Sequence, residues 1–257
     1  MSAVNERRVP PLQGGRNFRD LGGYAAADGR RVKWGILFRS GSLAGLTQAD
    51  WDTLTARRVR AVCDLRTTRE REAEPFAWKD AGLEYFARDY ATSFGELRKV
   101  LATNLATEAA ARAAMVSGYR ELPFEQSQAY GQIFLHLRRN DVPLIFNCSA
   151  GKDRAGTAAA LVLGALGVKR DAIIEDFVLT NQVLDLRKAL TSSVGDASLM
   201  SGRPTAVVTA ILDADAQYIE AALDSVEEKH GSIEGYLRDV LSVDDRDLVS
   251  IRGNLLE

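Results

Sequence analysis

Residues 142–168 read VPLIFNCSAGKDRAGTAAALVLGALGV, and this segment carries the strongest structural signal in the chain. An apolar run follows Pro143 and stops at Cys148, which predicts a buried strand. Gly151 and Gly156 interrupt the next segment, and the residues after them are apolar on nearly every side, which is typical of a core helix. A strand, a tight loop and a buried helix in this order aim backbone N–H groups and the positive end of a helix dipole at one small volume beside Cys148. The sequence therefore predicts an anion site that an oxyanion such as phosphate fits.

Two side chains of this loop predict its chemistry. Cys148 and Arg154 are six positions apart, so a curled loop brings both to the same anion. A free thiol has a pKa of ~8.5, and helix N-termini and nearby cations lower such values to ~3.5–7.5. A guanidinium is a planar fork that can hold two phosphate oxygens. We therefore expect Cys148 to attack phosphorus, Arg154 to bind the phosphate, and a phosphocysteine to form as the intermediate.

A second cysteine shows that the spacing alone is weak evidence. Cys63 is also followed six residues later by an arginine, Arg69. Its loop contains no glycine, and the neighbouring carboxylate of Asp64 would repel a phosphate. We interpret Cys63 as a buried strand residue, because unpaired cysteines usually behave as small core hydrophobes. If both cysteines end adjacent strands, a reversible protective disulfide between Cys63 and Cys148 is a further hypothesis.

The loop sequence NCSAGKDRAG resembles the HCxAGKDRTG signature of the bacterial tyrosine phosphatase family that includes the mycobacterial PtpB-type enzymes. Other segments resemble that family in the same order: NFRDLGGY at 17–24, GILFRSGSL at 35–43, CDLRTTRE at 63–70, YRELP at 119–123 and HGSIEGYL at 230–237. The resemblance implies a protein tyrosine phosphatase-like fold that acts on phosphotyrosine, and also raises phosphoserine, phosphothreonine and phosphoinositides as substrates. The phosphate-binding loop would consist of Cys148, Ser149, Ala150, Gly151, Lys152, Asp153 and Arg154.

The loop departs from the family pattern at two positions. Asn147 replaces the family's histidine before the nucleophile, and an amide can form hydrogen bonds but carries no charge. Ala155 replaces a hydroxyl residue that would help the sulfur leave the phosphoenzyme, and Thr157 should face another direction on the helix. One lost hydrogen bond of about 1–3 kcal/mol slows one step roughly ten- to a hundred-fold. We expect a slower enzyme, not a dead one.

Asp153 lies inside the loop, and we expect it to be the general acid. A neighbouring dianion favours the protonated form of a carboxyl group, so Asp153 would keep its proton beside a bound phosphate. Cleavage of a phosphate monoester requires such an acid next to the leaving oxygen. The alternative is that Asp153 points to solvent or pairs with Arg154. Asp64 and Asp89, each near the carboxyl end of an expected strand, are then the reserve candidates.

Lys152 adds a second cation to the loop. It is either a solvated loop lysine or a contact to extra charge on the substrate, as would suit phosphoinositides as well as phosphopeptides. A nucleotide-binding Walker loop is rejected, because Phe146 stands where that motif needs glycine and Asp153 stands where it needs serine or threonine.

Composition bounds the remaining possibilities. The chain has 257 residues, 46% hydrophobic and 26% charged, which predicts one globular domain over residues 1–257. A net charge of −2 does not suggest nucleic-acid binding. Two histidines without a Cys/His cluster argue against a zinc site, and we expect neither a metal nor a cofactor. No segment has the ~20 apolar residues of a membrane span or the pattern of a signal peptide, so a cytoplasmic location is expected. Secretion by a specialised route, which the resemblance makes conceivable, would leave no trace in the sequence.

The remaining chain predicts a central, mostly parallel sheet with helices on both faces. Strands are expected at residues 59–65 and 83–86, with shorter apolar pieces at 32–34 and 36–38. Asn17, Arg19, Asp20, Arg39 and Ser40 either reach the site or satisfy turns. Capping boxes at Thr47/Asp50 and Thr67/Glu70 begin two helices.

The other expected helices lie in the second half of the chain and in one insertion. Residues 93–118 form a helical insertion that is either a packing helix or, as the resemblance implies, a mobile lid over the site. A further helix should begin at Pro123 and end near Arg139, with His136 in it as a partly buried polar residue. Residues 169–190 supply one or two helices, and 191–203 have loop composition. Helices at 215–230 and 233–241, and a last one capped by Ser242, make the final third helical.

Three functions are compatible with these patterns. The first is a cysteine-dependent phosphatase. The second, suggested by Asn147 and Ala155, is a phosphate-binding pseudophosphatase with little or no turnover. The third is a sulfur- or arsenic-handling enzyme, which would usually need a shuttle cysteine, and only Cys63 is available.

Overall fold

The computed structural model describes residues 6–76, 82–90, 107–184 and 202–257 of the chain. Within these ranges five strands form one sheet, in the spatial order β1, β2, β5, β3, β4. Their bounds are Arg19–Asp20 (β1), Leu37–Ser40 (β2), Ala61–Asp64 (β3), Glu84–Ala87 (β4) and Leu144–Asn147 (β5). All neighbouring strands run parallel except β1, which pairs antiparallel with β2. The predicted α/β fold with a mostly parallel central sheet is therefore confirmed.

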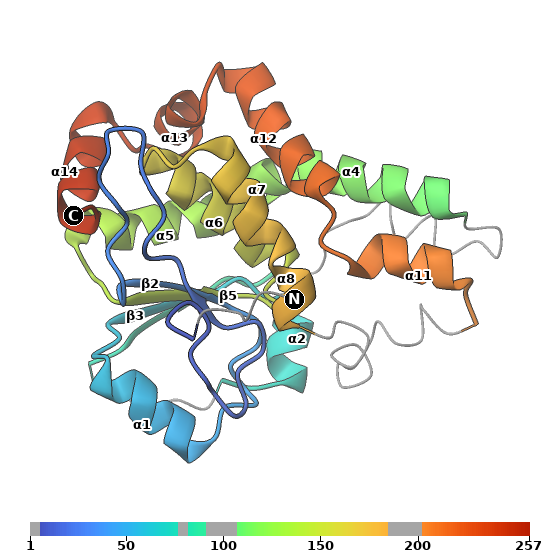
Figure 1. Ribbon diagram of the computed structural model, residues 1–257, viewed down its shortest axis with the longest axis horizontal. Coiled ribbons are helices and arrows are strands. Elements are labelled where there is room, and N and C mark those ends of the chain that lie inside the picture. Colours follow the sequence, from blue (N-terminus) through green and yellow to red (C-terminus); the bar gives the residue numbers. More distant parts are fainter. Residues whose placement is uncertain (1–5, 77–81, 91–106, 185–201) are drawn as a thin grey trace.

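Helices cover both faces of this sheet (Figure 1). The small helix α1 lies on one face, and the long helices α4 to α6 lie on the other with the C-terminal helices packed outside them. The bounds in chain order are Gln48–Ala56 (α1), Thr68–Ala73 (α2), Glu108–Glu125 (α4), Ser127–Arg139 (α5), Asp153–Ala165 (α6), Arg170–Val178 (α7), Thr180–Val183 (α8), Thr205–Leu212 (α11), Ala216–His230 (α12), Ile233–Leu241 (α13) and Asp245–Leu255 (α14). No helix in the described ranges has the length and apolar character needed to cross a membrane.

The central strand β5 supplies both cores, because alternate residues of a strand face opposite sides of the sheet. Ile145 lies in register with Phe38 and Val62, and all three belong to the smaller core, which also holds Leu54 of α1. Phe146 belongs to the larger core, which includes the buried residues of α6. Every residue of α6 from Ala155 onward is buried, so the predicted core helix is confirmed.

Three parallel strands end at the same edge of the sheet. The register aligns Ser40 at the end of β2, Asn147 at the end of β5 and Asp64 at the end of β3. Cys148 follows β5 directly, and α6 begins at Asp153. The loop that the sequence singled out therefore lies at the carboxyl edge, where open α/β folds bind ligands.

Segments from opposite parts of the sequence meet beside α14. An antiparallel bridge joins Ala25 to Arg31, and a second joins Val32 to Leu256. The backbones of Arg31 and Glu257 donate to each other at 2.7 and 2.8 Å. Figure 1 shows this early turn beside the C-terminal helix. Of the expected piece at 32–34, only Val32 forms a β-bridge.

The helix boundaries confirm some predictions and correct others. Both predicted capping boxes are present, and Gly231 ends α12 in the left-handed conformation. The prediction that Pro123 begins a helix is wrong: Pro123 lies in the last turns of α4, and the chain breaks at Gln126, after which α5 begins. The prediction that Ser242 caps the last helix is also wrong, because Ser242 ends α13 and Asp244 caps α14.

The predicted insertion is described only in part. Residues 93–106 lie outside the described ranges, so the lid hypothesis stays a prediction. Residues 108–118 form the first part of α4, whose start is capped by the Thr107 side chain. This helix packs mainly against α12. Most of the predicted loop at 191–203 also lies outside the described ranges.

Candidate active site

Hydrogen bonds from other parts of the chain to its carbonyl groups hold the loop between β5 and α6 in place. Donors from the N-terminal third of the chain bind four consecutive carbonyl oxygens. These donors are the Ser42 N–H (2.9 Å) and Arg16 (3.3 Å) on Ser149, Asn17 Nδ2 on Ala150 (3.0 Å), and Arg39 Nη2 on Gly151 (2.8 Å) and Lys152 (3.2 Å). With its carbonyls directed outward, the loop can present its N–H groups to the opposite side.

The backbone N–H groups of residues 149–154 are available to a ligand. None of them donates to a protein acceptor among the residues that the structure describes. Asp153 is the first residue of α6, so the positive end of that helix dipole points at the same place. Several free donors around one helix N-terminus are the arrangement that binds anions in proteins. This geometry supports the predicted anion site, which stays a prediction.

Gly151 is required by its backbone and by its surroundings. Its φ of +71° lies in the left-handed region that favours glycine. A Cβ at this position would also lie 2.6 Å from the Gly41 nitrogen and from the Ser40 carbonyl carbon. The loop thus packs directly against the end of β2, which only glycine permits.

Cys148 and Cys63 occupy different environments although both are buried and free. Cys148 has 1% of its surface exposed, its N–H donates to the Ser40 carbonyl at 3.2 Å, and it interacts electrostatically with Arg154. Cys63 lies inside β3 opposite Phe146, as expected for a strand residue. Burial, and then the charge of Asp64, raise the pKa of the Cys63 thiol far above its ordinary value. The disulfide between the two cysteines stays a prediction.

Arg154 is fixed by a carboxylate that the sequence analysis did not assign to the site. Its Nη1 and Nη2 donate to Glu70 at 2.7 and 2.8 Å, and Nη1 also reaches the Leu65 carbonyl and the Tyr90 hydroxyl. Burial opposes ionisation of Glu70, but the Arg154 charge and its hydrogen bonds outweigh burial and hold the pKa of Glu70 well below its ordinary range. No acceptor in the described ranges contacts the Nε hydrogen of Arg154, which leaves one edge of the guanidinium for an anion.

Asp153 has a defined orientation. The Tyr119 hydroxyl donates to Asp153 Oδ1 at 2.7 Å, and Lys152 Nζ lies 3.3 Å from the same oxygen. The Asp153 side chain is 24% exposed, and it makes no ion pair with Arg154. Oδ2 has no hydrogen-bond or ion-pair partner among the described residues.

The two reserve carboxylates are engaged elsewhere. Asp64 is buried and accepts hydrogen bonds from Arg66, from the Tyr85 hydroxyl and from Asn147 Nδ2. Asp89 has a side chain that is 83% exposed and pairs with Arg71. Both oxygens of Asp64 have hydrogen-bond donors, and within the described ranges Asp89 is bonded through Oδ1 alone.

Lys152 is not a solvated loop residue. Its side chain is 4% exposed, and Nζ donates to the carbonyls of Ile211 at 2.6 Å and Leu212 at 3.1 Å. These carbonyls end α11, where a helix dipole attracts a cation. The lysine therefore ties the loop to α11 and does not extend into solvent.

The departures from the family motif leave polar atoms without partners. Asn147 Nδ2 donates to Asp64 Oδ1 at 3.2 Å, but its Oδ1 is buried without a hydrogen bond among the described residues. The buried Thr157 Oγ1 is in the same position. Ala155 is fully buried and offers no donor to the Cys148 sulfur.

A buried charge cluster supports the loop, and its centre, Asp176 of α7, was not among the site residues predicted from the sequence. Asp176 pairs with Arg19 at 3.1 Å and with Arg39 at 2.6 Å, and all three side chains are at most 1% exposed. Burial would raise the pKa of Asp176, but the two arginines hold it well below its ordinary range. Burial, together with the nearby Arg19 charge, lowers the pKa of Arg39 to about 10. Since Arg39 binds two loop carbonyls, Asp176 sets the loop's position indirectly.

The other N-terminal candidates have structural roles. Asp20 accepts the N–H groups of Gly22 and Gly35 at 2.7 Å each, away from the loop. The Ser40 carbonyl accepts the Cys148 N–H. Within the described residues, the one group of side chains that could hold a metal ion lies at the other end of the sheet, not at this loop.

Comparisons with known proteins agree with this geometry. The model of the tyrosine phosphatase family matches residues 10–257. A candidate tyrosine-protein phosphatase of Cupriavidus necator is 34% identical over 247 residues, which cover 93% of this chain and 85% of that protein. The triple specificity protein phosphatase PtpB of Mycobacterium tuberculosis is 30% identical over 264 residues, which cover 90% of this chain and 93% of that protein.

Proposed function

Because the chain belongs to the tyrosine phosphatase family, we propose that it hydrolyses phosphate monoesters, phosphotyrosine first among them, through a phosphocysteine formed at Cys148. The observation that carries this proposal is the row of unbonded N–H groups at residues 149–154, held inward by the outward anchoring of four carbonyls. Residues 1–257 would act as one phosphatase domain.

In the proposed first step, the Cys148 sulfur attacks phosphorus while the bond to the leaving oxygen breaks. The loop N–H groups and the free edge of Arg154 bind the three non-bridging oxygens and stabilise the transition state. Asp153 gives its proton to the leaving oxygen from Oδ2, because Oδ1 is occupied by Tyr119. In the second step, water loses a proton to Asp153 and attacks phosphorus, and the thiolate and inorganic phosphate are released.

The substrate range is narrower in this arrangement than the family resemblance implies. A contact to a second phosphate group would need a cation at the mouth of the loop, and Lys152 is turned to α11 instead. We therefore propose phosphotyrosine in proteins as the main substrate, with phosphoserine, phosphothreonine and phosphoinositides as weaker ones. A panel of phosphopeptides and phosphoinositides measured at equal concentration tests this order.

Turnover of a generic aryl phosphate tests the mechanism. We expect vanadate-sensitive hydrolysis that is lost in Cys148→Ser and kept in Cys63→Ala, and a phosphocysteine that acid quenching traps on Cys148. Hydrolysis that persists in Cys148→Ser would contradict the proposal. Stoichiometric phosphate binding without any turnover would instead establish the pseudophosphatase, which the missing hydroxyl at Ala155 favours.

A further inference from the structure

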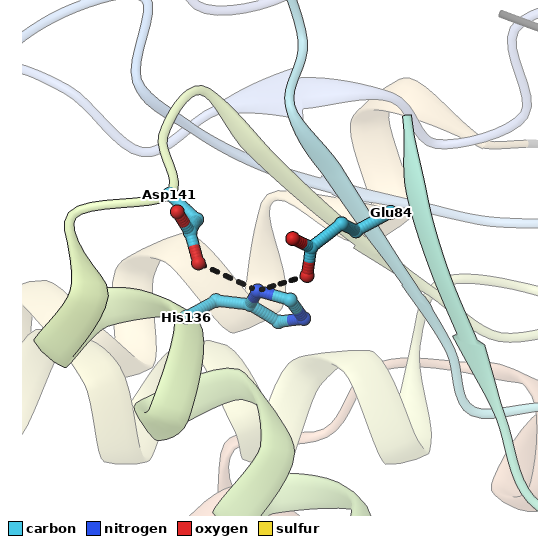
Figure 2. Close-up of side chains that lie close together, drawn as sticks. All are labelled: Glu84, His136 and Asp141. Atoms are coloured by element: carbon cyan, nitrogen blue, oxygen red, sulfur yellow. Dashed lines mark hydrogen bonds and ion pairs between the residues drawn. The ribbon is translucent and has the colours of Figure 1, made fainter. Parts of the chain in front are cut away.

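We propose a zinc-binding site, separate from the phosphate loop, formed by Glu84, His136 and Asp141. One ligand atom from each side chain lies within 4.8 Å of the other two. Figure 2 shows both carboxylates directed at the same ring nitrogen, Nδ1 of His136. The sequence did not predict this site, because Glu84 lies more than 50 positions before the other two residues and the group contains a single histidine.

Three different elements bring the ligands together. Glu84 is the first residue of the edge strand β4, and His136 lies in the last turn of α5. The chain leaves α5 through Asn140 in the left-handed conformation, and the Asp141 N–H donates to the His136 carbonyl at 2.9 Å. This turn brings Asp141 back beside the ring from which the helix has just departed.

The distances fit a metal ion better than they fit hydrogen bonds. His136 Nδ1 lies 3.4 Å from Asp141 Oδ2 and 3.7 Å from Glu84 Oε2. A good N–H···O bond is about 2.7–3.2 Å long, so neither contact is a strong one. Two ligands bound tetrahedrally to zinc at about 2.1 Å are separated by about 3.4 Å. The two nitrogen–oxygen contacts therefore have the spacing of ligands around an ion, and the two carboxylate oxygens lie within 4.8 Å of each other.

Charge and ligand type favour zinc. A neutral imidazole with two carboxylates carries two negative charges, which one divalent cation balances. Imidazole nitrogen with carboxylate oxygen is a ligand set that Zn²⁺ accepts, and a water molecule would complete four-coordination. The ligands also lie at the negative end of the α5 dipole, which attracts a cation.

The surroundings orient the histidine for this role. The His136 side chain is 2% exposed, so its ring is held by packing. The side-chain amide of Gln132 lies 3.3 Å from His136 Nε2. If the amide is turned over, its oxygen accepts the Nε2 hydrogen and leaves the Nδ1 lone pair for the metal, a typical arrangement around metal-bound histidines. Arg60 lies 4.0 Å from the other oxygen of Asp141 and leaves Oδ2 free.

The site cannot take part in the proposed hydrolysis. Glu84 begins β4, and Asp141 precedes β5, so both lie at the amino edge of the sheet, while Cys148 follows β5 at the carboxyl edge. A metal here would tie the edge strand β4 to α5. Its expected effect is on stability, not on turnover.

Titration of the full-length chain with ZnCl₂ in a calorimeter tests the site. The variants are Glu84→Gln, whose side chain is 61% exposed, and Asp141→Asn. The control is Glu121→Gln, an exposed carboxylate of α4. We expect one Zn²⁺ ion at this site, an affinity at least ten-fold weaker in both variants, and no change in the control. Arg60→Gln should tighten binding, because it removes a competing cation.

Cys148 could also bind zinc, and cobalt distinguishes the two ligand sets. Co²⁺ bound at the proposed site should show visible bands of nitrogen and oxygen ligation without a sulfur-to-cobalt charge-transfer band, and these bands should disappear in Glu84→Gln. The melting temperature of the wild-type chain should rise with ZnCl₂, and that of Glu84→Gln should not. Equal zinc affinity in the wild-type chain and in Glu84→Gln, or a spectrum of thiolate ligation alone, would overturn the proposal. Both readouts are independent of phosphatase activity.

Discussion

The chain contains two loops with a cysteine and an arginine six positions apart, and they follow neighbouring parallel strands. Strand β5 ends at Asn147, directly before Cys148, and the chain then curls back so that Arg154 lies in the first turn of α6. Cys63 lies one residue before the end of β3, so the same count of residues carries Arg69 onto the exposed side of α2. Strand register, not spacing, decides which loop can bind an anion.

The second loop nevertheless serves the first. Residue 70 comes directly after Arg69, and the carboxylate of Glu70 holds Arg154 with two hydrogen bonds. The loop without glycine thus supplies an orienting anion, and the glycine-containing loop supplies the cradle. Variants at matching positions of the two loops test whether the loops differ in function as they do in structure.

Substitution of the two cysteines, one at a time, should give the largest difference in activity between the loops. Cys148→Ser removes the proposed nucleophile and should lower kcat for an aryl phosphate on the order of 10³-fold or more. Cys63→Ala removes only a buried sulfur from β3, so it should lower the melting temperature and leave kcat within about two-fold. Stopped assays of both variants against the wild-type chain check this. Equal losses in the two variants would show that the loops are not different in kind.

Substitution of the two arginines, one at a time, should give the next largest difference in activity. The planar guanidinium of Arg154 can bind Glu70 and phosphate simultaneously, and a lysine ammonium cannot. Arg154→Lys should therefore lower kcat/KM about 10²–10³-fold. Arg69→Lys, on an exposed helix side, should have no effect. If Arg154→Lys kept full activity, the assignment of the free guanidinium edge to phosphate would be wrong.

Restoring the family hydroxyl should speed the second step. Ala155→Thr offers the sulfur a hydrogen bond, and the slow phase after the pre-steady-state burst should rise about ten- to a hundred-fold. Because Ala155 is fully buried, the smaller Ala155→Ser serves as a second variant that avoids overpacking. Rapid-quench measurements separate burst from steady state. An unchanged slow phase in both variants would count against the role of this position.

Removal of the orienting anion should have the smallest effect on activity and a pH signature of its own. Glu70→Gln should lower kcat/KM about ten-fold, because Arg154 keeps a hydrogen-bond partner, but this partner no longer carries a negative charge. Since the folded protein holds the pKa of Glu70 below its ordinary value, the ionised carboxylate contributes its full stability above about pH 4.3 and loses it as the pH falls toward the folded-state pKa. The stability gap between the wild-type chain and Glu70→Gln should therefore narrow in acid.

Unfolding by urea at several pH values measures that gap. Glu72→Gln, an exposed carboxylate on the same helix, is the matched control and should show no such gap. A gap between wild type and Glu70→Gln that stays constant down to pH 3 would contradict the ion pair.

The local features of the fold and the site could be predicted from the sequence, because their signals are contiguous. Strand β5, the loop and α6 are consecutive, and the capping boxes at Thr47 and Thr67 need four residues each. The helix start at Pro123 failed, because a proline near the end of a helix can be accommodated by tertiary packing that no local pattern records.

The supporting residues could not be found in the same way. Tyr119 reaches Asp153 over 34 positions, and Asp176 reaches Arg39 over 137. Glu70 was visible as a capping residue, but its second role depends on the order of β3 and β5 in the sheet, which the sequence does not state. For Lys152 the sequence left open a solvated side chain or a contact to the substrate, because nothing local indicates that α11 ends beside it.

The anchoring of four loop carbonyls has a consequence for how this protein would behave among competing ligands. A rigid loop loses little conformational entropy when it binds an anion, so its affinity depends on the shape and charge of the tetrahedral group alone. Inorganic phosphate, sulfate and arsenate should then occupy it as readily as the end of a phosphorylated side chain does. The product would inhibit competitively, and turnover inside a cell would fall as the local level of free phosphate rises.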